Sequence, residues 1–180
     1  MAETSEVKQY FKNCFDKKLL IQKAIIAGAA LVLVLILSLS FYLWLKDKHG
    51  VVGEENNFWF LEISWNNGVG WNALSGNPAA IYAIQSIMFI LLLAIFMLLT
   101  HDRITSSFVA LAMFGGLFNL IQRGASGTNC VLDYFHFGFW RSFPIFNWPD
   151  TFVVIGIFGF VISYITLLII QAVKEKDGKH

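Results

Sequence analysis

Two aspartates stand in sequence surroundings that suit catalysis. Asp133 is flanked by apolar residues in the segment Val131-Leu132-Asp133-Tyr134-Phe135, and Asp150 precedes the last apolar stretch of the chain. Two carboxyl groups held close together in a semi-buried site cannot both ionise, so one stays protonated as an acid while the other draws a proton from water. The pair therefore predicts the chemistry of an aspartic protease.

Each aspartate also has a purely structural interpretation. Aspartate is favoured at helix N-caps, which would explain Asp150 at the start of an apolar segment. Asp133 would then be a surface loop residue. The seventeen positions that separate the two residues leave this interpretation open.

Other catalytic patterns have less support. The segment Gly124-Ala125-Ser126-Gly127 is similar to the G-x-S-G of rhomboid-type intramembrane serine proteases, but none of the four histidines lies in an apolar span where it could act as the base. No H-E-x-x-H zinc motif occurs, and the two cysteines lack metal-ligand spacing. A Ser-Lys dyad using Lys46 or Lys48 stays open, because spacing neither supports nor excludes it. We expect no metal and no cofactor.

The composition predicts the elements that position the aspartates. Hydrophobic residues make up 57% of the 180 residues and charged residues 14%, against roughly 45–50% and 25% in soluble proteins. Such a chain must expose apolar surface to lipid. Four stretches of 22, 23, 19 and 23 residues carry no Asp, Glu, Lys or Arg, and each is long enough to cross a hydrocarbon core of ~30 Å as a helix. These predicted spans are residues 24–45, 78–100, 104–122 and 151–173.

The distribution of lysine and arginine predicts the orientation. Nine basic residues lie on the side that holds both termini and the 101–103 connection, and four lie in the two long loops. By the positive-inside rule both termini are cytoplasmic, and the loops 46–77 and 123–150 face outward. The basic segment 1–23 is expected to anchor to anionic lipid of the inner leaflet, and residues 174–180 form a tail. The net charge of +1 gives no indication of a nucleic-acid partner.

The outward loops bring the aspartates together. Side chains alternate in character along residues 59–65, and Asn66-Asn67-Gly68 follows as a turn signal, so we predict a short sheet at the membrane surface. The third and fourth spans both reach the outer interface, and residues 24–173 are predicted to form one membrane domain. Asp133 and Asp150 should therefore meet at the outer ends of adjacent helices.

Three short blocks resemble the lipoprotein signal peptidase (signal peptidase II) family. Trp65-Asn66-Asn67-Gly68-Val69-Gly70-Trp71 is similar to the family's aromatic-Asn-x-Gly-Ala-Ala-Phe. Gly115-Gly116-Leu117-Phe118-Asn119-Leu120-Ile121-Gln122-Arg123 is similar to Gly-Gly-x-x-Gly-Asn-x-x-Asp-Arg. Val131-Leu132-Asp133-Tyr134 and Phe143-Pro144-Ile145-Phe146-Asn147-Trp148-Pro149-Asp150 are similar to Val-Val-Asp-Phe and Phe-Pro-x-Phe-Asn-x-Ala-Asp. The resemblance runs from about Leu35 to Ile170.

The resemblance implies a fold, an activity and a set of site residues. The fold is an all-α membrane protein with four transmembrane helices, a small extracytoplasmic β-cradle and an interfacial helix. The activity is cleavage of the signal peptide of lipid-modified prolipoproteins before the diacylglyceryl cysteine, at the outer face of the cytoplasmic membrane. The implied ligands are the lipidated prolipoprotein, membrane lipid and inhibitors of the globomycin type. The implied catalytic residues are Asp133 and Asp150, and the implied substrate-binding residues are Asn66, Asn119, Arg123 and Asn147.

The sequence departs from the family pattern near these residues. Gln122 stands where the family usually has Asp, which predicts weaker bracing of Arg123 rather than loss of activity. Phe118 replaces a glycine and is expected to push the neighbouring helix outward. Residues 124–129 lengthen the connection to Asp133, and the first span lacks the family's Asp-x-x-x-Lys feature. Pro149 replaces a common alanine, which suits the first turn of a helix.

Two functions of other classes stay open. A catalytically inactive four-span membrane scaffold would use the aspartates only as a cap and a surface charge. A small-solute transporter subunit would carry intramembrane polar groups, but near the midplane, whereas the sequence places Asp133 and Asp150 at one face.

Overall fold

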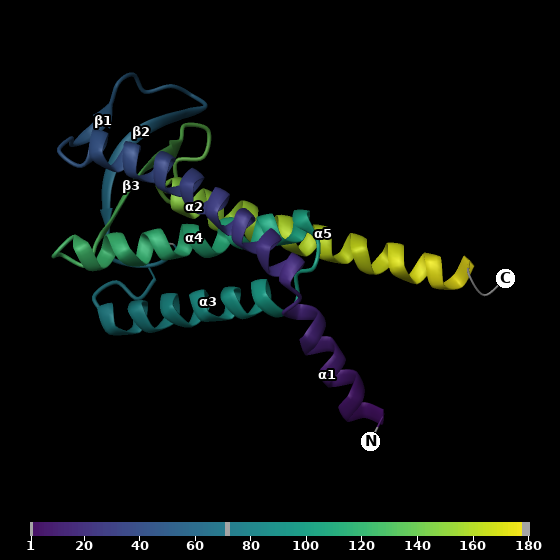
Figure 1. Cartoon of the computed structure of the whole chain (residues 1–180). Helices are drawn as coiled ribbons and strands as arrows, with labels where there is room; N and C mark the ends of the chain where they lie inside the picture. The colour runs from purple at the N-terminus through teal and green to yellow at the C-terminus, as the bar shows by residue number, and fades with distance from the viewer. Residues whose placement is uncertain (1, 71–72, 178–180) are drawn as a thin grey trace.

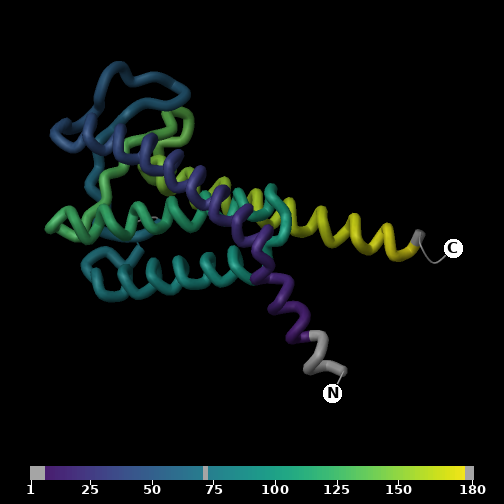
Figure 2. The backbone as a smooth tube through the Cα atoms, viewed as in Figure 1, coloured from purple at the N-terminus to yellow at the C-terminus, as the bar shows by residue number. Residues whose placement is uncertain are grey.

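The described residues form a helical bundle with a small sheet at one end. This computed structural model describes the backbone of residues 2–70 and 73–177. Figure 1 shows the strands gathered at the end of the bundle where α4 ends and α5 begins, and Figure 2 follows the chain from there to α1 near the opposite end. The helices are α1 (Ala2–Cys14), α2 (Lys17–Leu45), α3 (Pro78–Leu98), α4 (Arg103–Ala125) and α5 (Trp148–Asp177). The strands are β1 (Gly50–Val52), β2 (Trp59–Asn66) and β3 (Val131–Phe137).

Four of the described helices, α2, α3, α4 and α5, are long and apolar enough to cross a membrane, which confirms the four predicted spans. Side-chain caps set where three of them begin. The side chains of Asp16, Asn77 and Asp102 accept hydrogen bonds from the first backbone N–H groups of α2, α3 and α4. Because Asp16 is the cap, α2 begins at Lys17, seven residues before the charge-free stretch that starts at residue 24.

Helix α4 is the centre of the bundle, since it packs against α5, α2 and α3. Its contact with α5 depends on glycine. A Cβ atom added to Gly156 would lie 2.5 Å from the carbonyl oxygen of Phe108 and 2.6 Å from the backbone nitrogen of Ala112. A Cβ atom on Gly115 would lie 2.6 Å from the carbonyl oxygen of Pro149. The two backbones therefore approach each other more closely than any larger residue would permit.

The three strands form one antiparallel sheet in the order β1-β2-β3, which confirms the small sheet expected in the outer loops. Asp133 lies opposite Ser64 in the register of β2 and β3, next to an irregularity between Leu61 and Ser64. Aromatic rings join the sheet to the helices. Phe41 of α2 stacks on Tyr134 of β3 with ring centroids 5.3 Å apart, and the hydroxyl of Tyr134 accepts a hydrogen bond from the backbone N–H of Trp148, at 3.1 Å.

A short irregular segment connects β2 to α3. Its described residues, 67–70 and 73–77, form turns closed by an isolated bridge between Val69 and Ala73. Trp71 of the first motif lies outside the described residues. A helix that the sequence did not predict, α1, lies at the opposite end of the bundle.

Candidate active site

Asp133 lies on β3 and is almost completely buried, with 2% of its surface exposed. Its two carboxyl oxygens each accept a hydrogen bond from a side-chain amide. Asn66, the last residue of β2, donates from Nδ2 to Oδ2 at 2.9 Å. Asn147, just before α5, donates from Nδ2 to Oδ1 at 2.7 Å. The strand pairing and the start of α5 together fix this carboxyl group.

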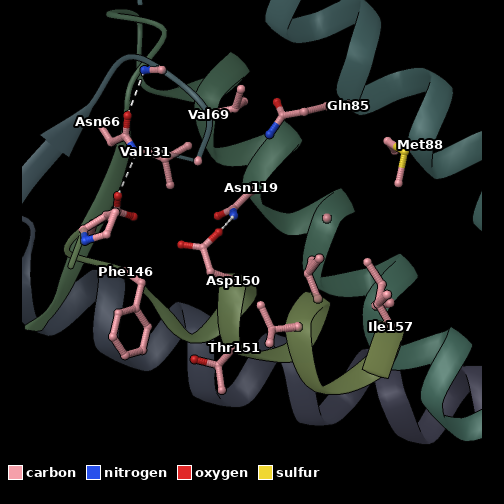
Figure 3. A pocket seen from close by; sticks show the side chains of 18 of the residues that line it. Asn66, Val69, Gln85, Met88, Asn119, Val131, Phe146, Asp150, Thr151 and Ile157 are labelled. Atoms are coloured by element: carbon pink, nitrogen blue, oxygen red, sulfur yellow. Dashed lines mark hydrogen bonds between the residues drawn. The ribbon is translucent and has the colours of Figure 1, made fainter. Parts of the chain in front are cut away.

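Asp150 lies in the first turn of α5 and is partly buried. The Nδ2 atom of Asn119, on α4, donates to its Oδ1 at 2.7 Å, as Figure 3 shows. The backbone N–H of Asn147 donates to its Oδ2 at 3.2 Å, while the Oδ1 of Asn147 accepts from the backbone N–H of Asp150 at 2.9 Å. This reciprocal pair is a capping box, in which Asn147 is the cap. Asp150 therefore has a structural role and still presents a carboxyl oxygen to Asn119.

Asn147 connects the two aspartates. Its side chain is 1% exposed, and its Nδ2 lies 2.7 Å from Asp133 Oδ1, 3.2 Å from Asn119 Oδ1 and 3.3 Å from the carbonyl oxygen of Leu132. An amide nitrogen has two hydrogens for these three acceptors. The result is a continuous chain of hydrogen bonds that links Asp133 to Asp150 through two buried asparagines.

Arg123 braces the loop that follows β2. Its guanidinium is buried and donates to three backbone carbonyl oxygens, those of Asn66 at 3.3 Å, Gly68 at 2.7 Å and Asn129 at 2.6 Å. The inserted residues 124–129 thus fold back and supply one of its acceptors. Arg123 holds the main chain of Asn66, and so acts on Asp133 through the asparagine.

The pKa of the Asp133 carboxyl lies well above its usual value. Burial is the main cause, and the charge of the nearby Asp150 carboxyl adds to it. The amide donors Asn66 and Asn147 and the charge of Arg123 act in the opposite direction without cancelling the effect. Burial also raises the pKa of the neighbouring Tyr134 hydroxyl. The site thus favours a proton on Asp133.

An apolar cavity of about 540 Å³ opens beside the aspartates, between α3, α4 and α5. Asp133 and Asp150 line it together with Asn66, Asn119 and Arg123, and most of its remaining wall is aliphatic or aromatic. Gln85 is an exception. It extends from α3 toward α4 (Figure 3), lines the cavity, and its buried Oε1 atom has no hydrogen-bond partner among the described residues.

A second pocket of about 460 Å³ lies on the sheet side and shares Asn66, Asp133 and residues 143–145 with the first. Its wall includes His136, whose Nδ1 lies 2.6 Å from Glu62 Oε2 and whose Nε2 lies 3.0 Å from the carbonyl oxygen of Arg141. Asp133 therefore lines both an apolar cavity and a more polar pocket.

The structure brings all six of the residues named from the sequence into this one site. Sequence reasoning missed Gln85, the pair of His136 with Glu62, and the role of Asn129. A lone amide in the apolar stretch 78–100 was a usable signal for Gln85, because polar groups in a span are costly. The other two depend on contacts across 74 and 6 positions that no local pattern reveals. Within the described residues, no group of three His, Cys, Asp or Glu side chains could hold a metal ion.

Comparison with known proteins identifies the family. Residues 30–166 match the family model for signal peptidase (SPase) II. The chain belongs to the signal peptidase II family. It is therefore a membrane protease of the signal peptidase type.

Relatives of this signal peptidase II family member support the same assignment. It is 33% identical to the lipoprotein signal peptidase of Malacoplasma penetrans, over 96% of this chain and 76% of that protein. It is 32% identical to the lipoprotein signal peptidase of Mycoplasmoides gallisepticum, over 94% of this chain but only 57% of that protein. A solved structure described as a bacterial membrane enzyme has the same fold, with a TM-score of 0.66 and 24% identity over 80% of this chain and 87% of the other.

Proposed function

We propose that this signal peptidase II family member is an aspartic endopeptidase that removes the signal peptide of lipid-modified prolipoproteins, before the diacylglyceryl cysteine. The observation that carries the proposal is the linkage of two carboxyl groups, Asp133 and Asp150, by side-chain amides at the polar end of an apolar cavity. An enzyme that cuts next to a lipid anchor needs this combination, because its scissile bond lies where the bilayer meets water.

In the proposed mechanism the two aspartates share one proton, and Asp133 holds it in the resting enzyme. Ionised Asp150 takes a proton from a water molecule as the water oxygen bonds to the scissile carbonyl carbon, and Asp133 gives its proton to the carbonyl oxygen. Asp150 then passes its new proton to the nitrogen of the cysteine as the C–N bond breaks. Asp133 recovers a proton from one hydroxyl of the intermediate, so both groups return to their initial states.

The surroundings of the aspartates support this class of substrate. The cavity wall from α3, α4 and α5 is apolar and suits acyl chains and an apolar signal helix, whereas the pocket on the sheet side suits the polar segment beyond the cut. A peptide backbone at this depth lacks water and needs protein partners for its N–H and C=O groups. Asn66, Asn119, Arg123 and Asn147 are the proposed source of these partners.

We further propose that both termini are cytoplasmic and that the site lies at the outer face. The support is the charge distribution. The bundle end that is distant from the aspartates carries the lysines of residues 8–23, Arg103, and Lys174 and Lys176 of α5. The positive-inside rule places such an end in the cytoplasm.

The transporter interpretation has less support than the protease interpretation. Both carboxyl groups lie at one end of the bundle, at the junction of β3 and the first turn of α5, and not midway along the spans. Solute carriers place their coupling groups near the bilayer midplane.

Cleavage of defined peptides tests the proposal. The protein in lipid nanodiscs is incubated with a prolipoprotein peptide that carries a diacylglyceryl cysteine, and with the same peptide without the lipid, and the products are identified by mass spectrometry. We expect a single cut before the cysteine in the lipidated peptide alone, and inhibition by globomycin. Binding of the peptide without cleavage would favour the scaffold, and a cut at any other bond would contradict the assigned substrate.

A further inference from the structure

Helix α1 precedes residues 30–166, which match the family model, and it does not take part in the site. It ends at Cys14, and Asp16 caps a new helix, α2, so that a short break separates the two. Figure 1 shows α1 turning away from the bundle at the end distant from the sheet. The role of α1 must therefore be inferred from its own contacts and its exposed residues.

One side of α1 is attached to the C-terminal end of α3. The hydroxyl of Tyr10 donates to the carbonyl oxygen of Leu98 at 2.6 Å, and Cys14 Sγ lies 3.4 Å from the same oxygen and 3.6 Å from His101 Nε2. Lys23 of α2 donates to the preceding carbonyl, that of Met97, at 2.7 Å. Side chains from α1 and α2 thus satisfy carbonyls that the end of α3 would leave unpaired.

The neighbouring row of α1 is apolar and exposed. Val7 and Phe11 of α1, and Phe15 directly after its end, follow each other at intervals of four residues. The backbone N–H of Phe15 still donates to the carbonyl oxygen of Phe11, so the three side chains share one side, and their exposed fractions are 52%, 47% and 50%. On a helix this row lies directly beside the row of Tyr10 and Cys14 that contacts α3. Three large apolar side chains are therefore exposed at the end of the bundle distant from the aspartates.

A basic row lies on the other side of the apolar one. Lys8 and Lys12 occupy it, and Lys17 and Lys18 continue the positive charge across the break. All four lysines are exposed, and between residues 7 and 18 the chain has one acidic residue, Asp16, whose carboxylate is engaged as the cap of α2. An exposed apolar row bordered by lysines is the pattern of a helix that lies in the interface of an anionic bilayer.

We propose that α1 is an interfacial helix that binds anionic lipid in the leaflet opposite the aspartates. Val7, Phe11 and Phe15 enter the acyl region, and Lys8 and Lys12 contact the phosphates of the headgroups. Through Tyr10 and Cys14 the bound helix holds the C-terminal end of α3, and residues between 84 and 92 of the same helix line the apolar cavity. The proposal does not depend on the assigned protease substrate.

Depth measurements on the full chain test this proposal. A nitroxide label is attached to Phe11→Cys in a Cys130→Ser background, in which Cys14 stays buried. Accessibility of the label to oxygen and to a water-soluble nickel chelate is measured by electron paramagnetic resonance, in nanodiscs of phosphatidylcholine with and without phosphatidylglycerol. Asn13→Cys, on the polar side of the same helix, is the matched control.

We expect the label at position 11 to be exposed to oxygen and protected from nickel in the anionic nanodiscs, and the label at position 13 to show the reverse. Adding Lys8→Gln and Lys12→Gln should return the label at 11 to water. An aqueous label at 11 in anionic nanodiscs, or a depth independent of lipid charge and of both lysines, would overturn the proposal. Dipolar broadening between labels at 11 would also overturn it, because a second copy of the chain would then cover the row.

Discussion

At the scale of single residues, Asn147 has two roles that mutation can separate. It caps α5 through its Oδ1, and it joins Asp133 to Asn119 through its Nδ2. Asn77 caps α3 in the same way but contacts neither aspartate in the described structure. The pair of asparagines therefore distinguishes loss of a cap from loss of the link between the carboxyl groups.

We expect Asn147→Ala and Asn77→Ala to lower the free energy of unfolding by similar amounts, about 0.5–2 kcal/mol. Only Asn147→Ala should also lower kcat, by ~10²-fold or more, since Asp133 loses the donor that fixes it. Thermal unfolding in detergent and single-turnover cleavage measure the two effects. Equal rates for the two variants would show that the link is unnecessary.

Because the pKa of Asp133 is raised, we expect this residue to make the stability of the protein depend on pH. The pKa of Asp133 is higher in the folded state than the ~3.9 of an aspartate in an unfolded chain. Its contribution to the free energy of unfolding is therefore complete below pH ~3.9, and it is lost as the pH rises through the folded-state pKa. Asparagine does not ionise. We expect Asp133→Asn to be inactive and yet to melt at a higher temperature than the parent near neutral pH, with the difference disappearing on acidification toward about pH 4.

The exposed Asp47→Asn is the control for that measurement. It should leave the melting temperature close to that of the parent at both pH values. If Asp133→Asn were less stable than the parent at neutral pH, the carboxylate would contribute favourable interactions in the folded state, and the assignment of the proton to Asp133 would be wrong.

At the scale of elements, the contact of α4 with α5 sets the distance between Asn119 and Asp150. Gly156→Ala places a methyl group against the backbone of α4, so α5 must move outward. We expect a loss of about 1–3 kcal/mol in the free energy of unfolding, as for overpacked cores, together with a lower kcat. The matched control is Gly28→Ala in α2, where a Cβ atom would meet nothing within 4 Å.

Gly28→Ala should be neutral or stabilising by about 0.5–1 kcal/mol, because alanine favours a helix. Both variants are compared by thermal unfolding and by cleavage rate in the same lipid. Unchanged activity in Gly156→Ala would show that the position of Asp150 does not depend on this close contact.

The elements also show what charge and hydropathy can predict. Uncharged stretches identified the four spans, since only a helix satisfies its backbone inside a bilayer. Helix α2 extends beyond its charge-free stretch, because the lysines at 17 and 18 stay exposed at its first turn and the cap at Asp16 decides where the helix begins. Helix α1 was not predicted, because its apolar residues are separated by polar ones and form no continuous hydrophobic stretch.

At the scale of the whole molecule, the sequence identified the residues of the site but not the hydrogen bonds between them. Asp133 and Asp150 were recognisable as acids in apolar surroundings, and the family resemblance named the asparagines. Asn66 donates to Asp133 across 67 positions of sequence, and this contact depends on strand register. The 124–129 insertion gives Arg123 an acceptor, and this contact depends on how the loop closes. Such contacts arise only when the folded elements meet.

The central claim is that two carboxyl groups act as one unit, and a double-mutant comparison tests it most directly. Asp133→Asn, Asp150→Asn and the double variant are assayed for cleavage of a lipidated prolipoprotein, with Asp102→Asn, a cap at the other end of the bundle, as the control. We predict that each single variant loses ~10²–10⁴-fold in rate and that the double variant loses no more than either. A single variant that cleaves at the parent rate, or losses that multiply in the double variant, would contradict the account.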